Sequence, residues 1–159
     1  MTERNAAFQD EIAGIGGRCY AYQARKTANA VLRAYNDWMK PIDLEMAQFS
    51  TLCAILDGRA GSIGDLADLL GVERTTLVRN LKVLEKKGLV RVAARRQRRL
   101  THELTEAGVE MMRRALPLWQ QAQIAMEAAV GGSRERDIHG ALRDLRQALP
   151  AAFAAEAGS

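Results

Sequence analysis

Apolar residues recur at intervals of three or four along most of the chain, the spacing that places them on one face of an α-helix. One such stretch runs from Arg18 to Met39 and stops before Pro41, and a second extends from about Leu44 to Leu56. The second stretch places four side chains on one predicted face, namely Phe49, Leu52, Cys53 and Leu56. We therefore predict a mainly α-helical protein.

The segment before the first long helix has a different character. Residues 1–17 end in "AGIGG", and the glycines at 14, 16 and 17 favour a break in any regular helix there. We predict an N-terminal arm over residues 1–17, either irregular or with a short helix of its own.

Two short amphipathic segments follow in the middle of the chain. The first, "SIGDLADLLG", has a helix-capping Ser62 followed three residues later by Asp65, and it ends at Gly71. After "GVE", the second runs from about Arg74 to Lys87 and stops at Gly88. Two helices joined by a tight turn that contains glycine form a helix-turn-helix.

After the second of these helices, the segments "LVRV" and "RRLTHEL" predict two short strands, with "AARRQ" as the tip of a hairpin between them. A long amphipathic helix then begins after Thr105, and Ser133 begins another. The predicted fold class is thus mainly α with a small two-stranded β wing. It consists of a winged helix-turn-helix domain at 44–104, flanked by helical regions at 18–43 and 105–159.

The long helices near the two ends of the chain carry more apolar surface than a small domain can cover. Such faces are most simply buried against a second copy. We therefore predict that 18–43 and 105–159 form the dimerisation region of a homodimer. A monomeric bundle, in which both ends pack only on their own chain, is the alternative.

Positive charge is concentrated in one segment. Residues 74–99 include ten Lys or Arg residues and a single acid, Glu85, whereas the whole protein has a net charge of +4. On the predicted helix, the leucines at 77, 81 and 84 form the buried side. The opposite side carries hydroxyls and cations: Thr75, Arg79, Lys82 and Lys86, flanked by Thr76.

This row of side chains suits insertion into the major groove of double-stranded DNA, where Arg pairs with guanine and Thr contacts phosphate or a thymine methyl group. A second basic group lies at the hairpin tip, where it can reach phosphates or the adjacent minor groove. It consists of Arg95, Arg96, Arg98 and Arg99. Together the two groups predict a DNA-binding protein.

Other functions fit less well. A solvated surface helix interleaves acids with its cations, and a membrane-binding helix exposes aromatic or leucine side chains; the helix at 74–87 does neither. The sequence has no nucleophile–base pair near its two histidines, no phosphate loop and no metal-ligand cluster, so we expect no enzyme, cofactor or metal. A protein-interaction module remains an alternative. Without a signal peptide or membrane span, the expected location is cytoplasmic.

The sequence resembles the multiple-antibiotic-resistance regulator (MarR) family of bacterial winged-helix repressors. The likeness rests on "LADLLGVERTTLVRNLKVLEKKGLV", a short basic hairpin and "LTEAG", and covers roughly residues 18–130. It implies a homodimer bound to a pseudopalindromic operator, with the helix at 74–87 in the major groove and the wing in the minor groove. By position, Arg98 matches the arginine that enters the minor groove. Four residues match the start of the family's recognition helix: Arg74, Thr75, Thr76 and Arg79.

The wing departs from the family pattern. The family usually has an acid at the wing tip that orients an arginine, whereas Arg96, Gln97 and Arg98 stand there in this chain. We therefore expect the wing to act more through release of counterions than through recognition of groove shape.

The resemblance also implies an effector, often an aromatic acid or phenol, in a crevice between the dimerisation helices and the winged-helix domain. Arg25 or Lys26 is the expected partner of a carboxylate. The residues expected to line the crevice are Tyr20, Arg25, Tyr35, Trp38, Cys53 and Trp119. For any one aromatic residue among them, packing in the core or dimer interface is the alternative.

Cys19 suggests a different trigger. The organic-hydroperoxide sensors of the family carry a reactive cysteine near the start of the first long helix, where "RCY" lies in this chain. A thiol near a helix N-terminus and beside Arg18 has the environment of a reactive cysteine. Release by an effector and oxidation of Cys19 are thus competing hypotheses, and a cysteine that only packs in the core is a third.

Overall fold

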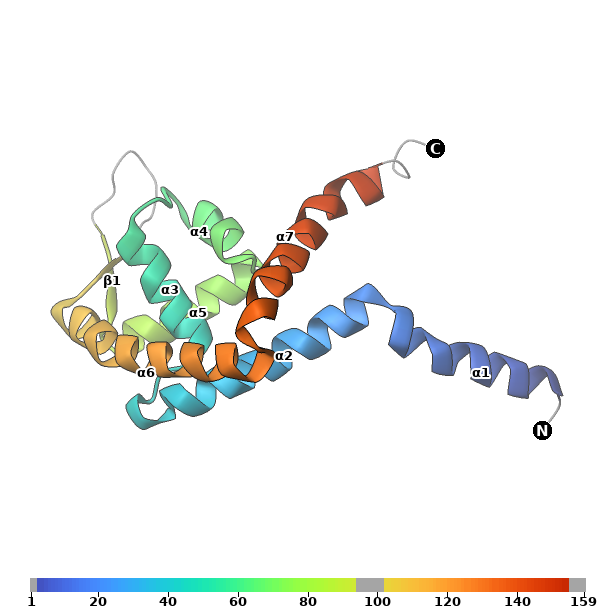
Figure 1. Ribbon diagram of the computed structural model, residues 1–159. Coiled ribbons are helices and arrows are strands. Elements are labelled where there is room, and N and C mark those ends of the chain that lie inside the picture. The colour runs from blue at the N-terminus through green and yellow to red at the C-terminus, as the bar shows by residue number, and fades with distance from the viewer. Residues whose placement is uncertain (1–2, 94–101, 155–159) are drawn as a thin grey trace. The chain divides into compact units, whose positions relative to one another are not determined.

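The computed structural model describes residues 3–93 and 102–154 and confirms the mainly helical fold with a two-stranded wing (Figure 1). The elements in chain order are α1 (Glu3–Arg18), α2 (Tyr20–Met39), η1 (Lys40–Ile42), α3 (Met46–Asp57), α4 (Ile63–Leu70), α5 (Arg74–Lys86), β1 (Val90–Val92), β2 (His102–Leu104), α6 (Glu106–Val130) and α7 (Gly132–Ala154). The chain divides within α6 into two compact units, Met1–Trp119 and Gln120–Ser159.

The first helix corrects one prediction. Helix α1 continues through the glycines at 14, 16 and 17 and ends only at Arg18. Cys19, which has extended backbone, separates it from α2. A glycine weakens a helix by roughly 1 kcal/mol relative to alanine but does not prevent it, so the predicted break falls at Cys19 instead.

The chain then turns sharply between α2 and α3. Pro41 lies in η1 and ends α2 as predicted, because proline lacks the N–H that the next helical hydrogen bond needs. Helix α3 begins with a reciprocal capping box formed by Glu45 and Gln48. In addition, the backbone N–H of Met46 donates to Oδ1 of Asn36 at 2.7 Å, which ties the start of α3 to α2.

The predicted helix-turn-helix is confirmed as α4 and α5. Ser62 caps α4, because its Oγ accepts a hydrogen bond from the backbone N–H of Asp65 at 3.1 Å. Gly71 ends α4 in left-handed backbone with a φ of 64°, a conformation that glycine adopts without strain. Helix α5 ends at Lys86, and the left-handed residue Gly88, with a φ of 69°, follows two residues later.

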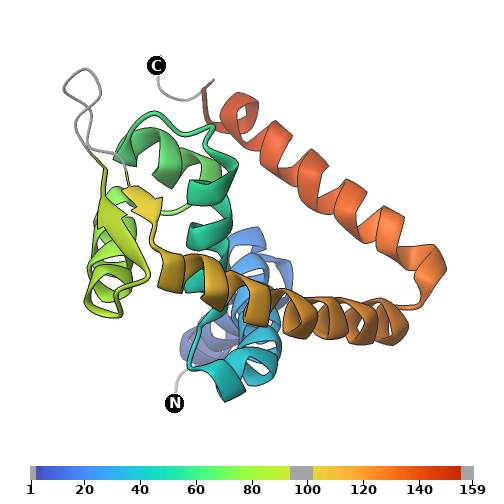
Figure 2. The ribbon, with the colours of Figure 1, turned by 90° about the vertical axis from the view of Figure 1, so that its left-hand side faces the viewer.

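The wing is an antiparallel hairpin of β1 and β2, in which Val90 pairs with Leu104 and Val92 with His102. Its tip, residues 94–101, lies outside the described residues. Figure 2 shows β2 leading directly into α6. Thr105 makes this connection, since its hydroxyl donates to the carbonyl oxygen of Gly88 at 2.6 Å and accepts from the N–H of Gly108 at 3.0 Å.

Two clusters of buried side chains stabilise the winged-helix part. The larger joins α2, α3, α5, β1 and α6 and consists of Met39, Leu44, Phe49, Leu52, Leu84, Leu89, Val90 and Ala115. The smaller joins α3, α4 and α5 and consists of Ala54, Leu66, Ala67, Leu77 and Leu81. Leu56, which was predicted on the buried face of α3, is instead 62% exposed, because it follows Ile55, the last residue of the helix that packs against the two core clusters.

The second unit contains the end of α6 and the helix α7. Helix α7 begins at Gly132, so Ser133 lies in its first turn and not at its cap as predicted. Three large apolar side chains on α7 are between 41% and 46% exposed, namely Ile138, Leu142 and Leu149. They follow one another at intervals of four and seven residues and so share one helix face.

Candidate nucleic-acid interface

Helix α5 has one buried side and one exposed side. Leu77, Leu81 and Leu84 are at most 2% exposed and anchor the helix to both core clusters. All six residues of α5 that were predicted to contact DNA are exposed: Arg74, Thr75, Thr76, Arg79, Lys82 and Lys86. The spacing of the leucines therefore places the hydroxyls and cations on the solvent-exposed side of a helix whose other side packs in the core.

One flank of α5 is attached to α3 through polar contacts. The side-chain amide of Asn80 donates to Oγ1 of Thr51 at 2.8 Å and to the carbonyl oxygen of Ala47 at 3.1 Å. Near the end of the helix, Nζ of Lys87 lies 2.9 Å from Oδ2 of Asp43. These contacts fix the rotation of α5 about its own axis, and with it the direction of the exposed row.

The opposite flank of α5 is attached to the wing. Oε1 of Glu85 lies 2.9 Å from Nε2 of His102 in β2. The side chain of His102 is only 3% exposed. Sequence reasoning missed this contact, although the one acid in the basic segment and the one histidine in the predicted wing were both visible in the sequence.

Not every cation of the basic segment is available to a polyanion. Lys87 is paired with Asp43, and Nε of Arg91 lies 2.6 Å from Oε1 of Glu103 on the neighbouring strand. The predicted DNA-contacting residues of the wing tip fall outside the described residues, namely Arg95, Arg96, Arg98 and Arg99. In the described part of the basic segment, the exposed cations outside these two ion pairs are Arg74, Arg79, Lys82 and Lys86.

A pocket of about 430 Å³ lies between α3, α4 and α6. Its lining consists of Phe49, Ser50, Cys53, Ala54, Asp57, Arg59, Leu69 and Trp119. The rings of Phe49 and Trp119 are stacked, with centroids 6.4 Å apart and an angle of 24° between their planes. Arg59 forms an ion pair with Asp57 at the edge of the pocket. Burial raises the pKa of the Cys53 thiol above its ordinary value.

The structure unites two of the six residues that were expected around an effector. Cys53 and Trp119 both line this pocket, whereas the other four belong to α2 and do not line it. Tyr35 is buried, and Trp38 is 39% exposed. Tyr20 and Arg25 are exposed near the start of α2. The basic residue beside the pocket is Arg59, which the sequence did not single out.

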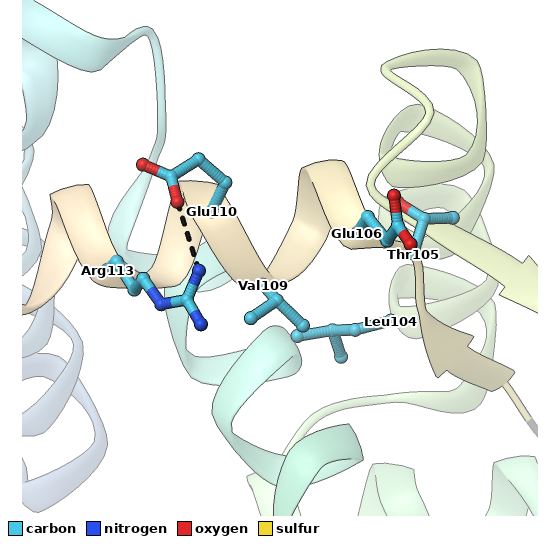
Figure 3. Close-up of a pocket in the computed structure, with 6 residues that line it drawn as sticks. All are labelled: Leu104, Thr105, Glu106, Val109, Glu110 and Arg113. Carbon is cyan, nitrogen blue, oxygen red and sulfur yellow. Dashed lines mark hydrogen bonds and ion pairs between the residues drawn. The ribbon is translucent and has the colours of Figure 1, made fainter.

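A second hollow, of about 500 Å³, lies at the start of α6 and is lined by Leu104, Thr105, Glu106, Val109, Glu110 and Arg113. In Figure 3 the side chains of Leu104 and Val109 approach each other on one side of α6. Arg113 is paired with Glu110 at 3.2 Å. With two carboxylates and no aromatic ring in its lining, this hollow suits an aromatic acid less well than the pocket at Trp119 does.

Cys19 is the N-terminal cap residue of α2, and its backbone continues the hydrogen bonding of α1 through a bond to the carbonyl oxygen of Ile15 at 2.9 Å. The junction is further tied by the side-chain amide of Gln23, which donates to the Gly16 carbonyl oxygen at 2.6 Å. Cys19 is half-buried, and both cysteines are free thiols.

Two features are absent from the part of the chain that the structure describes. None of the helices there is long and apolar enough to cross a membrane. Nor do the described residues contain three His, Cys, Asp or Glu side chains grouped so that they could hold a metal ion.

Comparison with known proteins gives consistent results. The model of the MarR family matches residues 42–100. The M. tuberculosis transcriptional regulator MosR is 36% identical, with a TM-score of 0.76, over 86% of this chain and 98% of MosR. MosR in complex with DNA is 38% identical, with a TM-score of 0.72, over 86% and 99% of the two chains. The transcriptional repressor CouR bound to p-coumaroyl-CoA is 25% identical, with a TM-score of 0.66, over 86% and 95%. Curated protein sequences gave no match.

Proposed function

The chain belongs to the MarR family of DNA-binding transcriptional regulators, and we propose that it is a homodimeric repressor whose operator binding is released by a small aromatic acid or phenol. The exposed row of α5 carries this proposal: Thr75, Arg79, Lys82 and Lys86 stand opposite the buried leucines, on a helix held in place from both flanks.

In this proposal α5 enters the major groove of double-stranded DNA. Its N-terminal residues Arg74, Thr75, Thr76 and Arg79 contact base edges and nearby phosphates, and Lys82 and Lys86 contact the backbone. The four arginines of residues 95–99 bind phosphates or enter the adjacent minor groove. MosR, which is 38% identical to this chain, has been solved in complex with DNA.

We assign dimerisation to α2 and α7. Helix α2 exposes Tyr22, Val31, Leu32 and Trp38, each between 38% and 44%, although it is part of a compact unit. Helix α7 exposes the apolar face that includes Leu142. Surfaces of this kind are buried in obligate dimers, and a two-fold dimer matches a pseudopalindromic operator. The same function implies a cytoplasmic location, because a transcriptional regulator must reach the chromosome.

For the effector we propose the pocket at Phe49, Cys53 and Trp119. The two aromatic rings and the neutral Cys53 thiol offer an apolar site for a flat ring, while the guanidinium of Arg59 lies at its edge for a carboxylate. An incoming carboxylate would compete with Asp57 for Arg59. CouR, a repressor with 25% identity, has been solved with p-coumaroyl-CoA, which contains an aromatic acyl group.

The test is a gel-shift titration with the promoter region that adjoins the protein's own gene, in the presence of a random-sequence duplex as competitor. Binding that resists the competitor and is released by an aromatic acid supports the proposal. The Arg59→Ala variant should bind the duplex unchanged and respond less to the acid. Binding that the competitor abolishes would contradict sequence-specific regulation and leave a non-specific DNA-binding protein.

Oxidation of Cys19 is a second candidate for the trigger. The observation in its favour is the position of Cys19 at the cap of the 20-residue helix α2, because cysteines at helix N-termini are among those that react with oxidants. Adding an organic hydroperoxide to the same gel shift separates the two candidates. Release by the hydroperoxide in the wild type but not in Cys19→Ser would identify the thiol as the sensor.

A further inference from the structure

We propose that His102 is a positioning residue for DNA binding: it holds the wing against helix α5 through Glu85. This inference rests on the proposed DNA-binding function and concerns residues outside the predicted DNA-contacting set. His102 lies in β2, paired with Val92, and is the first described residue after the hairpin tip that carries the four arginines. The contact between His102 and Glu85 therefore holds the wing at the strand end nearest in sequence to those arginines.

The contact joins two elements that bind DNA in different ways. On a helix of about 100° per residue, Glu85 lies about 80° from Leu77, between the buried leucines and the exposed row. Nε2–H of His102 donates to Oε1 of Glu85 at 2.9 Å. The histidine side chain is 3% exposed and that of the glutamate 37%. A hydrogen bond from a buried imidazole to a charged group restricts the distance and angle between the wing and α5.

The second ring nitrogen of His102 supports this assignment. Nδ1 is buried and has no hydrogen-bond partner among the described residues. Leaving a buried polar atom unpaired costs free energy, which a phenylalanine or leucine at this position would avoid. The hydrogen bond from Nε2 to Glu85 is thus the interaction that favours a histidine over an apolar residue at this position.

The contact also explains the one acid of the basic segment. A free carboxylate beside Lys82 and Lys86 would repel DNA phosphates. In the structure Glu85 instead accepts a hydrogen bond from His102 on the flank of α5. The acid therefore lies on the flank of α5 that faces the wing, outside the exposed row, and its contact with His102 fixes the wing.

The experiment compares variants of the full chain in gel-shift titrations with the promoter duplex described above. In His102→Gln the amide nitrogen reaches the position of Nε2, so the contact with Glu85 is kept. In His102→Asn the amide reaches only as far as Nδ1, so the contact is lost. His139, the other histidine, is exposed on α7, and His139→Asn is the matched control. Thermal unfolding of each variant shows that it is folded.

We expect His102→Asn to weaken binding about tenfold and to lower its salt dependence, because fewer wing arginines reach phosphates. His102→Gln and His139→Asn should stay close to the wild type. In a Glu85→Ala background, His102→Asn should cause no further loss, since its partner is already absent.

Three outcomes would overturn the proposal. Equal weakening by the Gln and Asn variants would show a purely steric role for His102. An equal effect of His102→Asn with and without Glu85 would show that His102 does not act through that residue. Unchanged binding in every folded variant would show that the contact does not matter for DNA. If the wild-type protein does not bind the duplex, that result contradicts the proposed DNA-binding function, and with it the role of His102.

Discussion

The side-chain amide of Asn80 in α5 donates a hydrogen bond of 2.8 Å to the hydroxyl of Thr51 in α3, a residue that is only 1% exposed. The hydroxyl donates in turn to the carbonyl oxygen of Ala47, also at 2.8 Å. Both groups are thus satisfied within a packed contact, and the direction of the exposed row of α5 is set by a polar bond as well as by leucines.

Replacing Asn80 with alanine should lower the free energy of unfolding by about 1–2 kcal/mol, because the Thr51 hydroxyl and Ala47 carbonyl lose a donor. Urea denaturation measures the loss. Thr75→Ala, at an exposed position of the same helix, is the control and should change stability by less than about 0.5 kcal/mol. Equal effects of the two substitutions would show that the contact adds nothing.

Arg79→Ala and Lys86→Ala should affect DNA binding differently. Loss of Arg79 is expected to cost about 1–3 kcal/mol and to relax the base preference at one position of each half-site. Loss of Lys86 should weaken all sequences alike and reduce the salt dependence by about one counterion. Titrations against a set of single-base operator variants decide between them, and a uniform effect of both substitutions would mean that the base-reading face is misassigned.

Gly108 should not tolerate a side chain. A Cβ at this position would lie 2.0 Å from the carbonyl oxygen of Leu89, which belongs to the backbone and cannot rotate away. We expect Gly108→Ala to destabilise the fold by about 1–3 kcal/mol or more. Gly140, a helical glycine of α7 with open space around it, is the matched control. Gly140→Ala should instead stabilise by about 0.5–1 kcal/mol, as measured by thermal unfolding.

The wing arginines should make DNA binding strongly salt-dependent. The tip has no acid to orient them, so we expect each arginine that binds a phosphate to add about 0.9 to the slope of log affinity against log salt. Replacing Arg95, Arg96, Arg98 and Arg99 with glutamine one at a time and measuring binding at several salt concentrations tests this expectation. A shallow slope in the wild type would instead favour recognition of minor-groove shape.

Cys53 should react slowly with alkylating reagents. Burial raises its pKa, so the thiol stays protonated, and unreactive, at pH values where a free cysteine, with a pKa of about 8.5, has begun to ionise. Because the folded state favours the neutral thiol, its ionisation should also lower stability as the pH rises above that value. Alkylation kinetics in Cys19→Ser measure the effect. An aromatic acid in the pocket should slow the reaction further, and a rate equal to that of free cysteine would contradict the burial.

Most of the winged-helix domain was predictable because its signals are local. The cap at Ser62, the stops at Gly71 and Gly88 and the spacing of Leu77, Leu81 and Leu84 each act within a few residues. The exposed row of α5 follows from the same spacing, so its orientation could be predicted from the sequence alone.

What the sequence did not predict depends on contacts between distant segments. Glu85 and His102 are seventeen residues apart, and only the folded hairpin brings them together. Arg59 stands beside Trp119 because α3 and α6 enclose a common pocket. The glycines of α1 led to a wrong prediction although their signal is local. Each one weakens the helix by a small free energy, and that cost is too small to end the helix.

Thr105 alone connects β2 to α6, and its hydroxyl bonds to both Gly88 and Gly108. A flexible loop at this point would let α6 move without the wing. A single hydrogen-bonded residue instead couples a movement of α6 to a movement of β2. The first half of α6 therefore runs without interruption from the wing to Trp119 and its pocket. If the proposed effector displaces Trp119, we expect the wing to tilt in the same step, so that DNA binding responds without any further moving element.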